Sequence, residues 1–402
     1  MPATLIESEL FGHEKGAFTG AIQKQMKRAW QIIIVIIIGL SINPVNSYAQ
    51  KKQKAFIDTL DNAFDFSYFL NDLHGFLPVV APITEPAVGY GAAIAGIFFI
   101  PKKEIDSTRF QMPDVTAVAG GLTQNNTWFV GGGYAGFWNK DKIRYRGIIG
   151  YGDIKLKYYG TGGGFLENNP ANFNLKTYFL IQQGLFRVGD SRFLLGGKYQ
   201  FMKTTATFFE DMPIINPLDI DMVNSGVGII AEYENFNNLF SPTKGLRVNL
   251  TYDQYLEFLG SDRDFGKFTL FTHFYQPVIP NSWTAGFRLE SQLATGNTPF
   301  YMIPFISLRG VPAMRYQGEL TALLETEQEF MLTRRWSVVG FAGYGKAAKS
   351  LNDLSEGSSA WNAGTGFRYL VARLFGLKMG VDVARGPEEW AVYVVVGTSW
   401  MK

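Results

Sequence analysis

Residues 377–400 decide the fold class, and they read Leu-Lys-Met-Gly-Val-Asp-Val-Ala-Arg-Gly-Pro-Glu-Glu-Trp-Ala-Val-Tyr-Val-Val-Val-Gly-Thr-Ser-Trp. In the first half, every second residue is apolar: Leu377, Met379, Val381 and Val383. In the second half, one face carries Trp390, Val392, Val394, Val396, Thr398 and Trp400. Successive side chains of a β-strand point to opposite faces of the sheet. The stretch therefore predicts two amphipathic strands, and its last face is a candidate terminal-strand signal.

The same alternation recurs upstream, in residues 246–253 and 283–290. The chain of 402 residues has 44 Gly, 34 Phe, 19 Tyr and 8 Trp, yet its mean hydropathy is zero. A soluble domain usually gathers its apolar residues in one core, whereas a transmembrane β-barrel has a lipid-facing apolar band, aromatic girdles and a polar interior. We therefore expect an all-β fold, a transmembrane antiparallel β-barrel. The alternative, a soluble sandwich or propeller, does not account for the long strands, the aromatic last strand and the export signal described below.

Several classes of function find little support in the sequence. The chain has no cysteine, which removes thiol catalysis, disulfides and thiolate metal sites. The net charge is +2 without a basic block, so nothing indicates a nucleic-acid partner. No G-x-S-x-G or H-E-x-x-H motif and no metal-spaced cluster occurs. We expect no catalytic activity, no cofactor and no metal, and we expect His273 to face the barrel lumen with Lys267 and Thr269.

A secretory signal is predicted at residues 26–49. Met26-Lys27-Arg28 is a basic start, residues 32–40 are apolar, and Ser47-Tyr48-Ala49 is a small-x-small cleavage site. The apolar run is short for a membrane-spanning helix, which is the alternative interpretation. The signal indicates export, and together with a barrel it indicates the outer membrane of a diderm bacterium.

The first 25 residues have another character. Residues 9–21 include Gly16-Ala17-Phe18-Thr19-Gly20-Ala21 and resemble the GAFTGA loop of AAA+ activators of alternative-sigma-factor polymerase. Those activators need a phosphate-binding G-x-x-x-x-G-K-[ST] loop, which the chain lacks. We interpret residues 1–25 as a mispredicted start or gene-junction artefact, with a functional fusion as the alternative, and expect translation to begin at Met26.

The remaining chain divides into a lead-in and a barrel. Residues 50–87 predict a short helical and then extended lead-in, with helical turns at 58–64, a helix after Ser67 and a proline-punctuated stretch from Phe76. From residue 88 to 402 we expect sixteen strands, which return both chain ends to the periplasmic side. The expected outside loops are 101–111, 139–141, 161–172, 210–222, 259–263, 295–317, 347–359 and 386–388. The expected inside turns are 124–126, 152–153, 189–190, 236–244, 277–281, 333–335 and 371–374.

Four segments carry a resemblance to the BamA/TamA-type outer-membrane barrels, also called bacterial surface antigens. They are Ser241–Arg247, Leu308-Arg309-Gly310, the strand with Glu325 that leads to Phe341–Gly345, and Gly364–Arg368 leading to Asp382. The resemblance covers most of residues 66–400. It implies that Arg309 and Gly310 lie on a loop that enters the lumen, where the arginine pairs with a carboxylate of a following strand. The alternative is an ordinary exposed loop arginine.

The partner candidates for Arg309 are Glu327 first, then Glu325 and Glu329, which share one strand face. Relatives often carry an aspartate about where Gly343 stands, so a second acidic contact is in question. Gly310 is expected to allow a tight loop tip where a Cβ would clash.

The resemblance also implies a function at the outer membrane, namely insertion or translocation of proteins or lipids. The expected partners are outer-membrane lipids, the barrel assembly machinery and client proteins. A weak seam is expected between residues 88–100 and 390–400, loosened by Gly89, Gly91, Gly96 and Gly397. Two departures from the larger members stand out: no periplasmic repeats precede the barrel, and Met401-Lys402 follow Trp400 where relatives often end in Phe. The alternative function is a passive or structural barrel without client-receiving domains.

Overall fold

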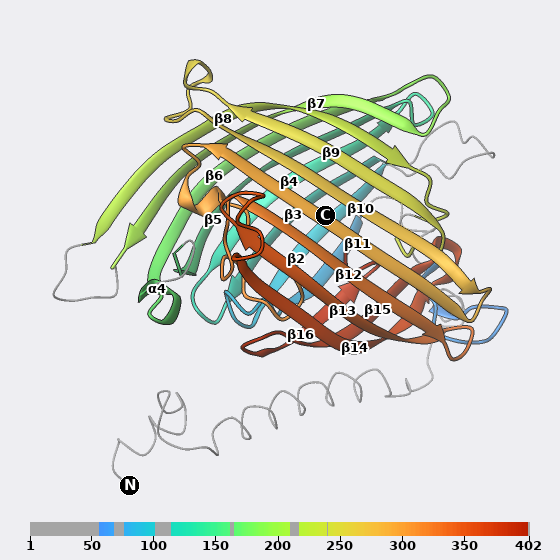
Figure 1. Ribbon diagram of the computed structural model, residues 1–402. Helices are drawn as coiled ribbons and strands as arrows, with labels where there is room; N and C mark the ends of the chain where they lie inside the picture. The colour runs from blue at the N-terminus through green and yellow to red at the C-terminus, as the bar shows by residue number, and fades with distance from the viewer. Residues whose placement is uncertain are drawn as a thin grey trace, which may run out of the picture. The chain divides into compact units, whose positions relative to one another are not determined.

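Sixteen strands form one antiparallel sheet in which each strand pairs with its neighbours along the chain (Figure 1). The computed structural model describes residues 56–67, 76–100, 114–160, 165–209, 217–238 and 240–400. The predicted all-β barrel and its sixteen strands are confirmed. Within these described ranges, no helix has the length and apolar character needed to cross a membrane. The GAFTGA-like segment and the predicted signal peptide lie outside the described residues.

The strands follow the chain without a crossover. They are β1 (Phe76–Ile83), β2 (Gly91–Ile100), β3 (Asp114–Thr123), β4 (Trp128–Trp138), β5 (Ile143–Tyr158), β6 (Ala171–Arg187), β7 (Phe193–Phe208), β8 (Leu218–Glu234), β9 (Gly245–Tyr255), β10 (Phe265–Ile279), β11 (Trp283–Gly296), β12 (Leu320–Met331), β13 (Trp336–Ala348), β14 (Ser358–Ala372), β15 (Leu377–Arg385) and β16 (Trp390–Val396). A one-turn helix, α4 (Phe165–Asn168), precedes β6.

The outer surface is the apolar band that the alternation predicts. Leu250 and Tyr252 of β9 are about two-fifths exposed, and on β4 the indoles of Trp128 and Trp138 stand exposed at the two ends of the strand. Side chains on the opposite face of β9, such as Asn249 and Asp253, are buried. Apolar residues outward, with aromatic rings near both ends, are the arrangement that a bilayer requires.

Strand length varies around the barrel. β6 and β8 have 17 residues each, whereas β1 has 8 and β16 has 7. At about 3.3 Å per residue, the long strands span over 50 Å and the short ones about 25 Å. The apolar band of such barrels is about 25 Å tall, so the long strands extend beyond it while the short strands just cover it. The sheet is therefore shortest where its two ends meet.

Two expectations about the strands are wrong, and their effects on the count cancel. The first strand is β1, inside the stretch from Phe76 that was predicted as lead-in, and the strand expected from residue 88 is β2. The expected turn at Gly152-Asp153 does not exist, because β5 continues through both residues and pairs there with β4 and β6. Glycine in a strand can mark close packing instead of a reversal. Here Gly152 stands opposite Phe129.

Since β1 is the first strand, the first three connections lie at the opposite end of the barrel from the end that the sequence predicted. Because β1 precedes β2, connections 101–111 and 139–141 lie at the end where β1 begins and β16 ends, and 124–126 lies at the opposite end. From the connection after β5 onward, the alternation of ends agrees with the expected loops and turns.

The segment before β1 is a turn attached to the barrel, where the sequence predicted helical turns. An isolated bridge pairs Ile57 with Phe64, and the N–H of Phe66 donates to the carbonyl of Val371. Three aspartates of this segment bind two arginines at the ends of β13 and β14. We name this set the aspartate clamp: Asp58, Asp61 and Asp65 with Arg335 and Arg373. Ser67 accepts a hydrogen bond from the N–H of Leu374, and the helix expected after it falls outside the described residues.

The sheet ends at β1 and β16, and no ladder pairs these two strands in the part of the chain that the structure describes. The seam expected between the second strand and the last one is thus bounded by β1 instead. Pro78 and Pro82 lie within β1, as is usual only for an edge strand. The glycines expected at the seam occupy other places: Gly89 precedes β2, Gly91 and Gly96 belong to β2, and Gly397 follows β16.

Candidate functional site

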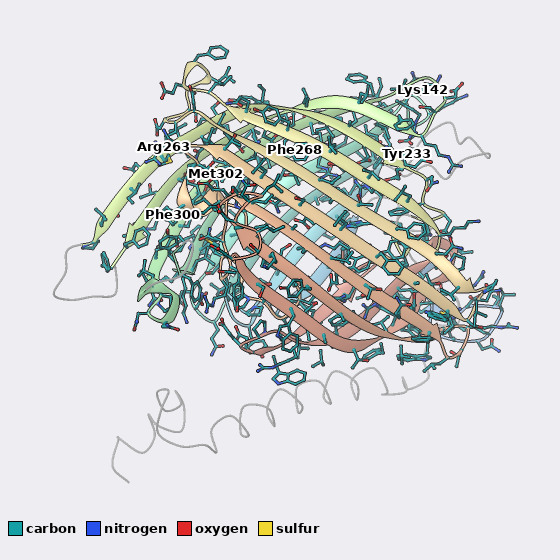
Figure 2. All side chains as sticks on the ribbon, viewed as in Figure 1. Lys142, Tyr233, Arg263, Phe268, Phe300 and Met302 are labelled. Atoms are coloured by element: carbon teal, nitrogen blue, oxygen red, sulfur yellow. The ribbon has the colours of Figure 1, made fainter. Side chains whose placement is uncertain are left out.

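The loop between β11 and β12, residues 297–319, folds into the barrel and reaches both walls. On one side Ile306, Leu308 and Val311 pack with buried residues of β12, β13 and β14. On the other side Met314 and Phe300 join a cluster from β6 and β7 that includes Phe173 and Ala206. Figure 2 labels Phe300 and Met302 on this loop; Met302 packs with Tyr255 and Phe265 at the ends of β9 and β10. The loop therefore crosses the lumen.

Arg309 is the centre of the loop's attachment to the wall. Its Nε and Nη2 donate to Glu325 Oε1 at 3.1 and 3.0 Å, and its Nη1 donates to Glu327 Oε2 and to Asp382 Oδ2, each at 2.7 Å. The guanidinium carbon lies 3.4 Å from the ring centroid of Phe341, a cation–π contact. Only 9% of the Arg309 side chain is exposed, which contradicts the alternative of an ordinary surface arginine.

Glu325 of β12 receives more donors than any other carboxylate named here. Besides Arg309, it accepts from Arg288 Nη1 at 3.2 Å, Asn362 Nδ2 at 3.0 Å and Trp400 Nε1 at 2.7 Å. The side chain has no exposed surface. A buried carboxylate is costly unless its oxygens are paired and hydrogen-bonded, and here both oxygens are.

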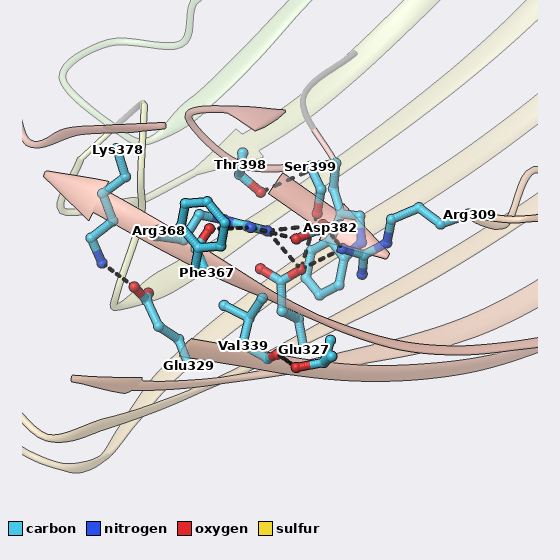
Figure 3. A network of polar contacts seen from close by, with 12 residues as sticks. Arg309, Glu327, Glu329, Val339, Phe367, Arg368, Lys378, Asp382, Thr398 and Ser399 are labelled. Carbon is cyan, nitrogen blue, oxygen red and sulfur yellow. Dashed lines mark hydrogen bonds and ion pairs between the residues drawn. The ribbon is translucent and has the colours of Figure 1, made fainter. Parts of the chain in front are cut away.

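The network continues across β14 and β15. Asp382 is also held by Arg368, which lies 3.6 Å from Glu327 (Figure 3). Of the three predicted carboxylates, the structure brings Glu327 and Glu325 to Arg309. Glu329 is not a partner of Arg309; it accepts from Lys378 Nζ at 2.6 Å and from the Ser337 hydroxyl.

Asp382 is the partner that the sequence analysis missed. It lies 73 residues after Arg309, on the polar face of β15. The alternation of residues 377–384 places it toward the lumen, but no local pattern links it to a loop so distant in sequence. It supplies the further acidic contact that Gly343 cannot. An ideal Cβ at Gly343 would lie 2.6 Å from Asn362 Oδ1, so the position has no room for an aspartate in this packing.

Gly310 has a conformation and a position that other residues tolerate poorly. Its φ is +82°, and an ideal Cβ would lie 2.9 Å from the backbone nitrogen of Gly386. Its own N–H donates to the Tyr393 hydroxyl at 2.8 Å. Left-handed backbone and close approach of another chain segment both require glycine here, as the sequence analysis expected.

The end of the chain turns into the lumen, which corrects the expected place of Trp400. β16 ends at Val396, and Gly397, with φ +76°, redirects the chain inward. The Trp400 indole is 2% exposed, bonds Glu325 and lies beside the His273 ring, which faces the lumen as expected. Of the predicted terminal-strand face, Trp390, Val392, Val394 and Val396 belong to β16, and Trp400 does not continue it.

The loop contacts both sides of the seam. Gly310 bonds Tyr393 of β16, and Ala313 lines the same cavity as Glu85 in the turn after β1. Burial raises the pKa of Glu85 above its usual range. The cavity, of about 480 Å³, is lined by Glu85, by Leu308, Arg309, Val311 and Ala313 of the loop, and by residues of β16. The loop thus bridges a gap that the strands leave unpaired.

No group of three His, Cys, Asp or Glu residues is arranged to hold a metal ion within the described ranges. The charged side chains around Arg309 bind one another, so the arrangement is suited to holding the loop in place.

Comparison with known proteins separates the two ends of the chain. Residues 1–37 match the Sigma-54 interaction domain. Over 28 residues, 68% are identical to the Nif-specific regulatory protein of Azotobacter vinelandii and to the C4-dicarboxylate transport transcriptional regulatory protein DctD of Rhizobium meliloti (strain 1021). These matches cover 7% of this chain and only 5% and 6% of those proteins. So short a match is consistent with an artefact.

Three similar solved structures are barrels. The structure of BamA from Haemophilus ducreyi lacking POTRA domains 1–3 superposes with TM-score 0.57 at 13% identity, over 81% of this chain and 70% of that one. CdiB from Escherichia coli gives 0.53 at 13%, over 79% and 62%. CdiB from Acinetobacter baumannii gives 0.52 at 11%, over 80% and 59%. The chain therefore spans less than two thirds of each CdiB chain, and these identities show a shared fold.

The family is shown by residues 171–380, just over half of the chain, which match the Omp85 superfamily domain. This match contains β6 to β14, the loop with Arg309 and the carboxylates Glu325 and Glu327. Together with the sixteen-stranded barrel, it identifies the chain as a BamA-like outer-membrane β-barrel that belongs to the Omp85 superfamily.

Proposed function

We propose that this barrel acts in the insertion or translocation of proteins or lipids at the outer membrane, reached by export through the signal at residues 26–49, and that it is not an enzyme. The observation that carries the proposal is the unpaired seam between β1 and β16, beside which the loop 297–319 lies against both Tyr393 and the cavity that Glu85 lines. Unpaired strand edges bind other strands readily. A seam that opens toward lipid can thus receive a client strand or release a lipid.

The loop is suited to close the seam reversibly. Arg309, near its middle, is held on β12 and β15 by buried charges. The loop's contacts with the strands beside the seam include one hydrogen bond, from Gly310 to Tyr393, and the ion pair of Arg315 with the partly exposed Glu388. A hydrogen bond contributes about 0.5–1.5 kcal/mol, whereas breaking a buried ion pair costs about 3–5 kcal/mol. The contacts at the seam can therefore open while Arg309 stays attached.

The proposed partners follow from the same edges. The outward row of β16, Trp390 to Val396, offers an apolar alternating strand to the barrel assembly machinery when this chain is itself assembled. Client chains would pair with the free edge of β1 or β16, and lipids flank both strands.

The test locks the seam reversibly. Glu85→Cys combined with Ala313→Cys, joined by a short bis-methanethiosulfonate linker, fixes the loop to the turn after β1. The chain has no native cysteine, so the linker has no other target. The barrel is reconstituted in vesicles, and heat-resistant folding of an added unfolded outer-membrane barrel is followed on gels, with each single-cysteine variant as control.

We expect the unlocked barrel to accelerate client folding over empty vesicles, the linker to abolish the gain and reductant to restore it. Client folding at the rate of empty vesicles would contradict the proposal. So would a gain that is the same with and without the linker, because the seam would then have no part in it.

A further inference from the structure

The inner surface of β1 to β4 is apolar, which is unusual for a barrel interior. One row across the four strands consists of Val79, Ala95, Ala119 and Gly131, which are neighbours in register. The next row consists of Leu77, Ile97, Ala117 and Gly133. Apart from Thr123 at one end, each inward position of these strands is Leu, Val, Ile, Ala, Gly or Phe. We name this surface the apolar wall.

The pairing with β5 shows that these rows face the lumen. Ala135 and Phe137 of β4 stand opposite Arg146 and Arg144 of β5. Arg144 reaches Glu232 of β8, three strands away, which is a contact across the interior. No apolar side chain of β1 to β4 is buried, whereas many on β5 to β16 are. The apolar wall is thus an accessible hydrocarbon-like surface inside the barrel, and such surfaces mark binding sites.

The apolar wall ends at β1, the strand that borders the seam. The outer faces of the same strands are apolar too, with Val80 71% exposed and Ile94 65% exposed. The two faces of β1 meet at the seam, and the cavity of about 480 Å³ lies beside it, lined by Glu85, by the loop and by β16. Since the seam lies against the bilayer, lipid acyl chains are the apolar molecules available at its opening.

One cation borders the apolar wall. Arg146 lies inward on β5, opposite Ala135, and no carboxylate of the described residues is within ion-pair distance of it. The neighbouring arginines differ: Arg144 binds Glu234 at 3.2 Å and Arg247 binds Glu232 at 2.9 Å. The three arginines line a cavity of about 160 Å³ with Phe137 and the two glutamates. Arg146 is exposed and forms no ion pair with the described residues, so its guanidinium can bind an anion.

We propose that the lumen binds a lipid with an anionic phosphate headgroup, its phosphate at Arg146 and its acyl chains along the apolar wall. Arg146 lies near the start of β5, at the end of the barrel that holds the aspartate clamp. A lipid of the inner leaflet carries its phosphate at that end, with its chains directed into the membrane. This site does not depend on whether the barrel inserts clients.

The experiment measures lipid bound to the folded full-length chain. Native mass spectrometry from a neutral detergent compares phosphatidylglycerol, uncharged diacylglycerol and inorganic phosphate as probes. Arg146→Gln removes the cation at nearly constant volume, with exposed Arg192→Gln as its matched control. Ala119→Asp places a charge on the apolar wall. Ala119→Phe fills it with an apolar ring and keeps the test valid if the aspartate variant fails to fold.

We expect one phosphatidylglycerol per barrel, bound about tenfold more weakly by R146Q, as for the loss of one charge-assisted hydrogen bond. R192Q should bind normally, both Ala119 variants weakly, diacylglycerol about tenfold more weakly than phosphatidylglycerol, and phosphate alone not at all. Equal lipid binding by R146Q and wild type would overturn the proposal, because only annular lipid would remain. Phosphate binding as strong as lipid binding, or a co-purified peptide as the bound species, would overturn it as well.

Discussion

The two inner walls of this barrel differ in chemistry: one is charged and the other is apolar. From β11 to β15, the lumen side carries Arg288, Glu325, Arg368 and Asp382, buried and paired with one another and with the loop. From β1 to β4, the lumen side is small, apolar and accessible. Buried charges bind specific partners in one geometry, whereas an apolar surface binds by area and without direction. The charged wall therefore fixes the loop, and the apolar wall leaves the seam side free to accept different molecules.

Strand length follows the same division. The strands beside the seam are the shortest of the sheet, and the seam itself is closed by loop contacts where other strand pairs have full ladders. Local opening is expected where backbone pairing and buried contacts are few. The apolar wall is thus on the side that can move, and the charged wall is its support.

Of the changes predicted here, Arg309→Ala should have the largest effect, because it weakens the attachment of the loop to the charged wall. It leaves Glu325, Glu327 and Asp382 with fewer cationic partners in a buried site, which costs about 3–5 kcal/mol for a broken buried pair. We expect the heat-resistant form on gels to melt at a lower temperature. Arg315→Ala, in the same loop but paired with the more exposed Glu388, is the control and should change little. Equal melting of the Arg309 variant and wild type would remove Arg309 from the site.

Glu325→Gln and Glu327→Gln rank the two carboxylates. Glu325 is fully buried among four donor residues, and Glu327 is 12% exposed. We expect a loss of about 2–3 kcal/mol for E325Q and about 1 kcal/mol for E327Q, measured by chemical unfolding. A larger loss for E327Q would show that Glu325 is not the hub.

Gly310→Ala tests the tip of the loop. The positive φ costs about 1–2 kcal/mol for a residue with a Cβ, and the contact with Gly386 adds to it. Gly340→Ala on β13 is the matched control, since an ideal Cβ there has no atom within 4 Å. Hydrogen exchange of residues 305–315 should rise for G310A alone. Identical exchange in both variants would contradict a strained tip.

Of the changes predicted here, acid should have the smallest effect on the barrel, because it should release only the segment before β1. The hydrogen bond from Arg373 lowers the pKa of Asp58 to about 2. A carboxyl group whose pKa is lower in the folded than in the unfolded state stabilises the fold at pH values above its unfolded pKa of about 3.9. This stabilisation is lost as the pH falls through the folded pKa. Proteolysis of residues 56–67 should therefore increase between about pH 4 and pH 2. Asp58→Asn should be susceptible across this range, and a wild-type segment that stays protected at pH 2 would refute the role of Asp58.

The sequence predicted the orientation of regular strands better than their ends. In residues 246–253 and 377–384 the period of two was enough, because one face meets lipid and the other does not. It failed at Gly152, where a glycine within a long strand resembled a turn. It failed again at Phe76, where two prolines concealed an edge strand. The correct number of strands came from these two opposite errors.

The charged network was predictable only in part. The resemblance around Arg309-Gly310 pointed to the loop and to one strand of glutamates, but alternation cannot rank residues that share a face. Glu325 is the centre of the network because of the way the loop aligns with β12. This alignment depends on the tertiary structure and not on the local sequence. Trp400 left its expected row because Gly397 turns the backbone, and Asp382 was too distant in sequence to suggest a contact.

The central claim is that the loop fills the lumen and bridges the seam. Single-channel conductance of the purified barrel in planar bilayers tests it most directly, with the loop intact and with residues 297–319 replaced by a short glycine-serine linker. We expect a closed barrel with the loop present and a steady ion-conducting pore after its removal. A steady open pore in the intact protein would contradict the account and favour a passive channel.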